Sequence, residues 1–81
     1  MRGARRLVSP RSVTVRLTTV GPPVAVDGRG VEAVREEWVV EDRWWTGRAL
    51  RRRYFELVLT DGRDLVVFHD LTGGSWFEQR G

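Results

Sequence analysis

Two segments of alternating apolar and polar residues flank Asp61-Gly62, and this arrangement constrains the fold more than any other feature of the chain. An Asp-Gly dipeptide accepts positive φ angles at both central positions of a type I′ turn, which joins antiparallel strands through a two-residue loop. With that loop the partners on one face are Leu59 with Asp64, Leu57 with Val66, Phe55 with Phe68 and Arg53 with Asp70. We therefore expect a β-hairpin whose apolar face enters the core and ends in an ion pair.

Other segments also have the character of short strands. Period-2 alternation covers residues 13–17, and β-branched or aromatic residues mark 24–27, 33–42 and 76–78. Glu32, Arg35 and Glu36 have helical spacing, but Trp38-Val39-Val40 favours a strand over the competing helix at 31–38. Short strands with closely spaced turns predict an all-β fold, a small antiparallel meander of about five strands that forms an open barrel or a strongly twisted sheet.

The length of 81 residues is enough for one small domain. Residues 1–12 lack sustained periodicity, so we expect a basic, mobile arm or an edge there and a single small β domain over 13–81. No cysteine is present, and no apolar run approaches the roughly 20 residues of a membrane span. We expect a soluble cytoplasmic domain with no membrane contact.

Basic charge comes only from arginine, with 14 residues and a net charge of +3. Guanidinium groups bind phosphate and carboxylate bidentately and stack on aromatic rings, which favours an anionic partner. A genome rich in G and C would also replace lysine with arginine, without any functional meaning. An acidic stretch from Glu32 to Asp42 lies between two arginine clusters, so the two signs are also able to pair within the folded domain. The first cluster is Arg2, Arg5, Arg6 and Arg11, and the second is Arg48, Arg51, Arg52 and Arg53.

Residues that could carry catalysis are few. His69 is the one histidine, and the expected register puts it opposite Tyr54, where ring stacking is a better explanation than general-base chemistry. His69, Asp64 and Asp70 have no known zinc-ligand spacing, and no glycine-rich segment has the form of a phosphate loop. We expect no enzymatic activity, no metal site and no cofactor.

The segment over residues 43–54 is the candidate binding site, because it interleaves aromatic rings with arginine. Its candidate residues are Arg43, Trp44, Trp45, Arg48, Arg51, Arg52, Arg53 and Tyr54. Adjacent tryptophans on an extended chain point to opposite sides, so Trp44 and Trp45 cannot both enter one core face. Such residues serve single-stranded nucleic acid binding and protein interfaces alike, while core packing is the alternative for each tryptophan.

The order of these residues resembles a known family. Glu37-Trp38, Asp42-Arg43-Trp44-Trp45, Arg52-Arg53-Tyr54-Phe55, the Asp61-Gly62-Arg63 turn and Trp76-Phe77 follow the pattern of the C-terminal segment of ImuB-type proteins. Those are catalytically degenerate relatives of Y-family DNA polymerases that serve a bacterial mutagenic repair complex, and small stand-alone bacterial proteins share the pattern. The resemblance covers roughly residues 24–79 and has no catalytic residue to transfer.

Together, these observations lead us to expect a non-catalytic binding module. The resemblance implies an accessory role in bacterial DNA repair or translesion synthesis, with DNA repair proteins or single-stranded DNA as partners. The alternative is a structural or oligomerising β domain, in which the tryptophans form a homodimer surface and nucleic acid plays no part.

Overall fold

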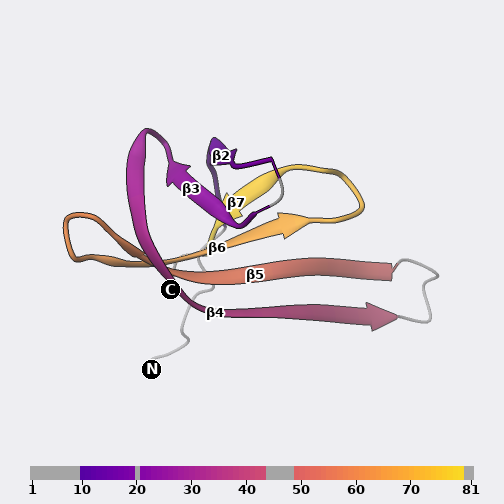
Figure 1. Ribbon diagram of the computed structural model, residues 1–81. Helices are drawn as coiled ribbons and strands as arrows, with labels where there is room; N and C mark the ends of the chain where they lie inside the picture. The colour runs from indigo at the N-terminus through magenta and orange to yellow at the C-terminus, as the bar shows by residue number, and fades with distance from the viewer. Residues whose placement is uncertain (1–9, 20, 44–48, 80–81) are drawn as a thin grey trace, which may run out of the picture.

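The computed structural model describes residues 10–19, 21–43 and 49–79, excluding the side chains of 42, 43 and 49, and the described part is an all-β domain (Figure 1). Its seven strands are β1 (Arg11–Ser12), β2 (Val15–Leu17), β3 (Pro23–Val26), β4 (Arg29–Arg43), β5 (Ala49–Leu59), β6 (Asp64–Asp70) and β7 (Trp76–Glu78). All neighbouring strands are antiparallel, in the order β1-β7-β6-β5-β4-β3-β2. Residues 31–38 therefore form part of a long strand rather than a helix. No helix in the described residues is long and apolar enough to cross a membrane.

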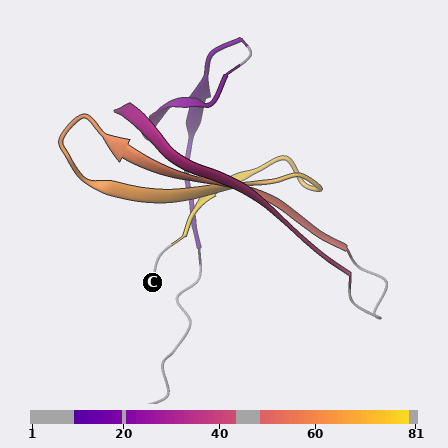
Figure 2. The same ribbon diagram turned by 60° about the horizontal axis from the view of Figure 1, so that its bottom comes forward.

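The sheet is strongly curled into a half-barrel (Figures 1 and 2). Its two edge strands, β1 and β2, are separated in the chain by only Val13 and Thr14. The N–H of Val13 donates to the carbonyl of Trp76 at 3.1 Å, and the carbonyl of Thr14 accepts from the N–H of Asp27 at 2.7 Å. The edge strands do not pair with each other, so the half-barrel stays open. This confirms the expected fold class, with seven strands rather than about five, in part because residues 11–17 divide between the two edges.

The core lies on the concave side of the sheet, which we call the inner face. Alternate residues of β5, namely Phe55, Leu57 and Leu59, are buried there. Val67 from β6 and Val26 from β3 complete the buried centre, so the curled sheet closes over its own apolar side chains. Partly buried apolar residues pack around it: Val13, Val15, Val31, Val34, Leu65 and Trp76.

The β5–β6 hairpin has a three-residue loop, and the expected two-residue loop is wrong. The N–H of Leu59 donates to the carbonyl of Arg63 at 2.8 Å, and Gly62 alone has a positive φ, at 90°. This is the pattern of a type I turn followed by a left-handed glycine. The Asp61 carboxylate supports it by accepting the Arg63 N–H at 3.0 Å within the loop.

The extra loop residue shifts the register by one, which exchanges the faces of β6. Leu57 lies opposite Leu65, and Phe55 lies opposite Val67, instead of opposite Val66 and Phe68. The expected ion pair between Arg53 and Asp70 is also wrong. The observed neighbours there are Arg53 with His69 and Arg52 with Asp70. Phe68 is therefore directed to the convex side of the sheet, which we call the outer face.

Candidate binding surface

Four aromatic side chains form a continuous row across the outer face. Trp38 of β4 is the register partner of Tyr54 on β5, which is the partner of Phe68 on β6, which in turn faces Phe77 on β7. Successive ring centroids are 5.3, 5.1 and 5.2 Å apart, within the range of favourable aromatic pairs. The row forms because the antiparallel register pairs one aromatic residue of each strand with an aromatic residue of the next strand. We call it the aromatic row.

Arg52 covers the middle of the aromatic row. It precedes Tyr54 by two positions on β5, so both side chains project from the outer face. Its guanidinium carbon lies 4.4 Å from the Phe68 ring centroid, and its Nη1 donates to the Tyr54 hydroxyl at 3.2 Å. A guanidinium group over a ring face is held by cation–π attraction. Arg52 is therefore oriented by the rings beside it.

The electrostatics near Arg52 include a carboxylate from β6. Asp70 is the register partner of Arg52. Backbone N–H groups of Gly73 and Thr72 donate to this carboxylate, and together with the nearby Arg52 charge they hold the pKa of Asp70 below its ordinary value. Asp70 thus remains ionised beside Arg52 at neutral pH, and this part of the surface carries both signs.

Trp38 is the accessible end of the aromatic row. Trp38 is 38 % exposed, whereas Phe68 in the middle is only 2 % exposed. The Trp38 ring stacks on Tyr54 with an interplanar angle of 5°, so one ring face is covered by its neighbour. Beyond it, β3 pairs with β4 only at Arg29 and Gly30. The indole consequently offers its other flank to an incoming group.

The inner face of the same β4–β5 ladder carries two ion pairs. Arg51 Nε lies 3.0 Å from Glu41 Oε2, and Arg53 Nε lies 3.5 Å from Glu37 Oε2. All four side chains are about half exposed, so each pair contributes only a few tenths of a kcal/mol to stability. The acidic stretch does pair with the second arginine cluster, at these two positions.

The structure divides the predicted site residues between the two faces. Arg52 and Tyr54 lie on the outer face with the aromatic row, whereas Arg51 and Arg53 lie on the inner face against glutamates. The backbone of Arg43 ends β4 opposite Ala49. The side chain of Arg43, together with the predicted residues Trp44, Trp45 and Arg48, lies outside the described part of the chain.

Three members of the aromatic row were missed as site residues by the sequence analysis. From the sequence, Trp38 and Phe77 serve as strand residues and as part of the family resemblance, and Phe68 is expected on the core face. They are distant in the sequence, and only the cross-strand register brings them together. The length of the loop at Asp61-Gly62 is the signal that could have found them. A three-residue loop places Phe68 opposite Tyr54, whereas a two-residue loop places His69 there.

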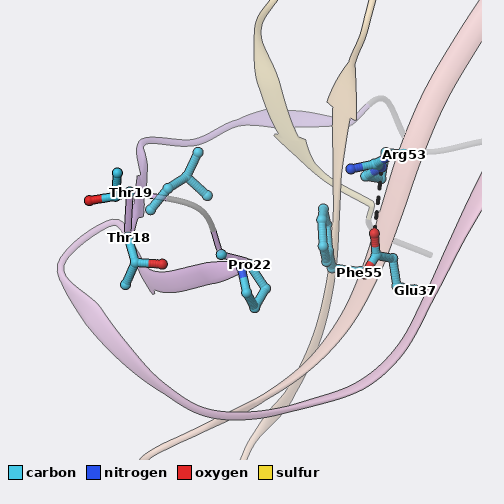
Figure 3. Close-up of a pocket in the computed structure, with 8 residues that line it drawn as sticks. Thr18, Thr19, Pro22, Glu37, Arg53 and Phe55 are labelled. Carbon is cyan, nitrogen blue, oxygen red and sulfur yellow. Dashed lines mark ion pairs between the residues drawn. The ribbon is translucent and has the colours of Figure 1, made fainter.

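A shallow pocket of about 340 Å³ lies on the inner side, between the loop after β2 and the β4–β5 ladder (Figure 3). Its lining residues are Leu17, Thr18, Thr19, Gly21, Pro22, Glu37, Arg53 and Phe55. The two threonines lie on one side and Phe55 on the other, beside the Glu37–Arg53 ion pair. Because Glu37 and Arg53 neutralise each other, the described lining offers threonine hydroxyl groups and one aromatic ring but no unpaired charge.

His69 lies on the inner face and stacks on Trp76, with ring centroids 4.4 Å apart and an interplanar angle of 0°. Stacking was the expected role, although the partner is Trp76 rather than Tyr54 because of the register shift. In the described ranges no three potential metal ligands come together.

Comparison with known proteins adds no relative from which a role could be transferred. The chain matches no family model, no curated protein and no solved structure.

Proposed function

We propose that this chain is a non-catalytic protein-interaction module whose binding surface is the aromatic row with Arg52. One observation supports it most: four rings on four strands lie in register on the outer face and end at the exposed Trp38. Tryptophan, tyrosine and arginine dominate the energetics of protein interfaces, because they bury a large area and keep a polar group available. Here all three types are adjacent and oriented by one another.

The charges around the row favour a protein over single-stranded DNA. On the outer face, Glu36 lies opposite Glu56, and Asp70 lies opposite Arg52. Arg51 and Arg53, which would bind phosphates, are on the other face with glutamates. Binding of single-stranded nucleic acid needs a positive groove along the stacked bases. The described outer face instead mixes acids with the guanidinium groups of Arg52 and Arg35, and the Arg35 group lies 3.9 Å from the Asp64 carboxylate.

The resemblance to the C-terminal segment of ImuB-type proteins suggests where a partner acts. An accessory module of that kind would bring a protein of bacterial DNA repair or translesion synthesis to this surface. The competing proposal is an oligomerising domain that uses the same rings to bind a second copy.

Selection from a random peptide library displayed on phage tests the proposal. We expect the immobilised protein to enrich peptides that Trp38→Ala no longer binds and that Val39→Ala still binds. These adjacent residues are a matched pair, since both are exposed large apolar side chains on β4 but they project from opposite faces. A parallel titration uses a labelled oligothymidylate at low and moderate salt.

Two results would contradict the proposal. Oligothymidylate binding that weakens steeply with salt and is lost in Arg52→Ala would identify a nucleic-acid surface instead. Enriched peptides whose binding is unaffected by Trp38→Ala would place the interface elsewhere. Sedimentation of the free protein separates out self-association: a monomer at all concentrations eliminates the oligomerising alternative.

A further inference from the structure

The outer edge of β4 from Glu36 to Arg43, which we call the free edge, has no partner strand in the described part of the chain. Strand β3 leaves β4 after Gly30, while β5 pairs with the opposite edge as far as Arg43. In Figure 1 β4 forms the lower border of the sheet, with no strand beyond it. Such an edge presents a row of backbone N–H and carbonyl groups that another extended chain is able to bind.

Side chains along the free edge define what such a chain would contain. Glu36, Trp38 and Val40 alternate on the outer face, so they contact every second residue of an added strand. Glu36 is the register partner of Glu56, and neither carboxylate makes an ion pair with another described residue. Like charges directly opposite each other destabilise a sheet, so a basic side chain beside them would be favoured.

A second copy of this chain is a poor occupant. Residues 36–42 contain Glu36, Glu37, Glu41 and Asp42 and no basic residue. Pairing two free edges would bring two such sets onto strands about 4.8 Å apart. Charged edge residues are a common protection against this kind of self-pairing. The same charges are complementary to a basic strand.

We propose that the free edge binds an extended basic segment of a partner protein as an additional antiparallel strand. The segment places arginine or lysine opposite Glu36 and apolar side chains opposite Trp38 and Val40. Because it runs antiparallel to β4, it reads apolar, any, apolar, any, basic from its N-terminal end. Main-chain hydrogen bonds hold the segment, and the alternate side chains give specificity. This inference rests on the proposed function and specifies the geometry and chemistry of the partner.

The test uses the full chain and a fluorescein-labelled peptide of sequence Arg-Thr-Val-Thr-Val-Thr-Arg, which has the required pattern in either direction. A matched peptide carries glutamate in place of both arginines. Two further peptides are methylated on the backbone nitrogens of either the odd or the even residues. Only one edge of the bound peptide faces β4, so we expect one methylated peptide to lose binding and the other to retain it.

Charge variants of the protein provide the second arm of the test. We expect Glu36→Lys to weaken binding of the arginine peptide about tenfold, because a favourable cross-strand pair becomes a repulsive one. Glu32→Lys is the control, since it makes the same charge change on β4 at an exposed position outside the free edge. Equal weakening by both variants would show a general charge effect and overturn the assignment.

The outcomes separate this inference from the proposed function. Binding that is lost in Trp38→Ala but withstands both methylation patterns overturns strand addition and leaves the protein-interaction surface in place. No binding of the arginine peptide also overturns strand addition, and the phage selection then decides independently on the surface. Dimerisation of the free protein that Glu36→Lys alters and Glu32→Lys does not would identify a second copy as the occupant, which likewise overturns the proposal.

Discussion

Asp27 and Asp61 are both followed by glycine, yet they form different turns. Asp27 and Gly28 both have positive φ, at 50° and 81°, and join β3 to β4 through a two-residue loop. Asp27 is held there by contacts from outside the turn, because its carboxylate accepts the Thr14 N–H at 2.8 Å and pairs with Arg11 at 2.9 Å. Asp61 instead accepts an N–H within its own loop. Tertiary contacts thus decide which turn the same dipeptide makes.

The contacts of Asp27, together with those of Asp70, make the stability of the fold depend on pH in the acid range. The Thr14 N–H, followed by the Arg11 guanidinium, lowers the pKa of Asp27 below its ordinary 3.8, and backbone N–H groups lower the pKa of Asp70. A lowered folded-state pKa stabilises the fold above the unfolded value, and this contribution disappears as pH falls through the folded value. We expect the free energy of unfolding, measured with urea, to decline as pH falls from about 4 downward.

The control for this pH dependence is the double variant Asp27→Asn with Asp70→Asn. Asparagine keeps an oxygen that accepts the same N–H groups but has no carboxylate to titrate. The unfolding free energy of the double variant should therefore vary less between neutral and acid pH. A decline as steep as that of the unchanged protein would assign the acid sensitivity to other carboxylates.

At the scale of the strands, β5 was predicted from the sequence more reliably than its partner β6. The inner residues Phe55, Leu57 and Leu59 follow from alternation along one strand and do not depend on the turn. The faces of β6 depend on the number of loop residues, and a single extra residue exchanges them. Tyr54 is the one member of the aromatic row among the predicted site residues. The other three rings lie on three other strands, and only the cross-strand register brings them next to Tyr54 and to one another.

Val66 and Val67 offer a matched test of the register. Val67 is fully buried on the inner face opposite Phe55, whereas Val66 lies on the outer face opposite Glu56 and is half-buried. We expect Val67→Ala to lower the free energy of unfolding by about 2 kcal/mol, and Val66→Ala by clearly less, because buried methyl groups leave a cavity. The two-residue loop would reverse this order. Denaturant unfolding of both variants decides between the registers.

At the scale of the whole molecule, residues 11–17 connect the two edges of the half-barrel. Arg11 forms ion pairs with Glu78 on β7 and with Asp27 in the β3–β4 turn, so it links both edges from one position. The backbone hydrogen bonds of this short segment are divided between β7 and β3. Loosening β1 should therefore affect β7 before the central strands.

Val13→Pro tests this connection, because proline lacks the N–H that donates to the Trp76 carbonyl. We expect faster amide hydrogen exchange in β7, measured by NMR, while the buried amides of β5 keep their protection. Val13→Ala is the control, since it shortens the side chain but retains the N–H. Equal loss of protection in β5 and β7 of Val13→Pro would show that the sheet opens as a single unit.

The pairing of β1 with β7 also has a consequence for synthesis of the chain. Arg11 is translated 67 residues before its partner Glu78, and Ser12 likewise long before Phe77. The β3–β4 and β5–β6 hairpins are able to form as they emerge, because their partners are close in sequence. β1 must therefore wait without its partner until β7 has been translated. The pairing of β1 with β7 is the last strand pairing that the order of translation allows, and it completes the half-barrel.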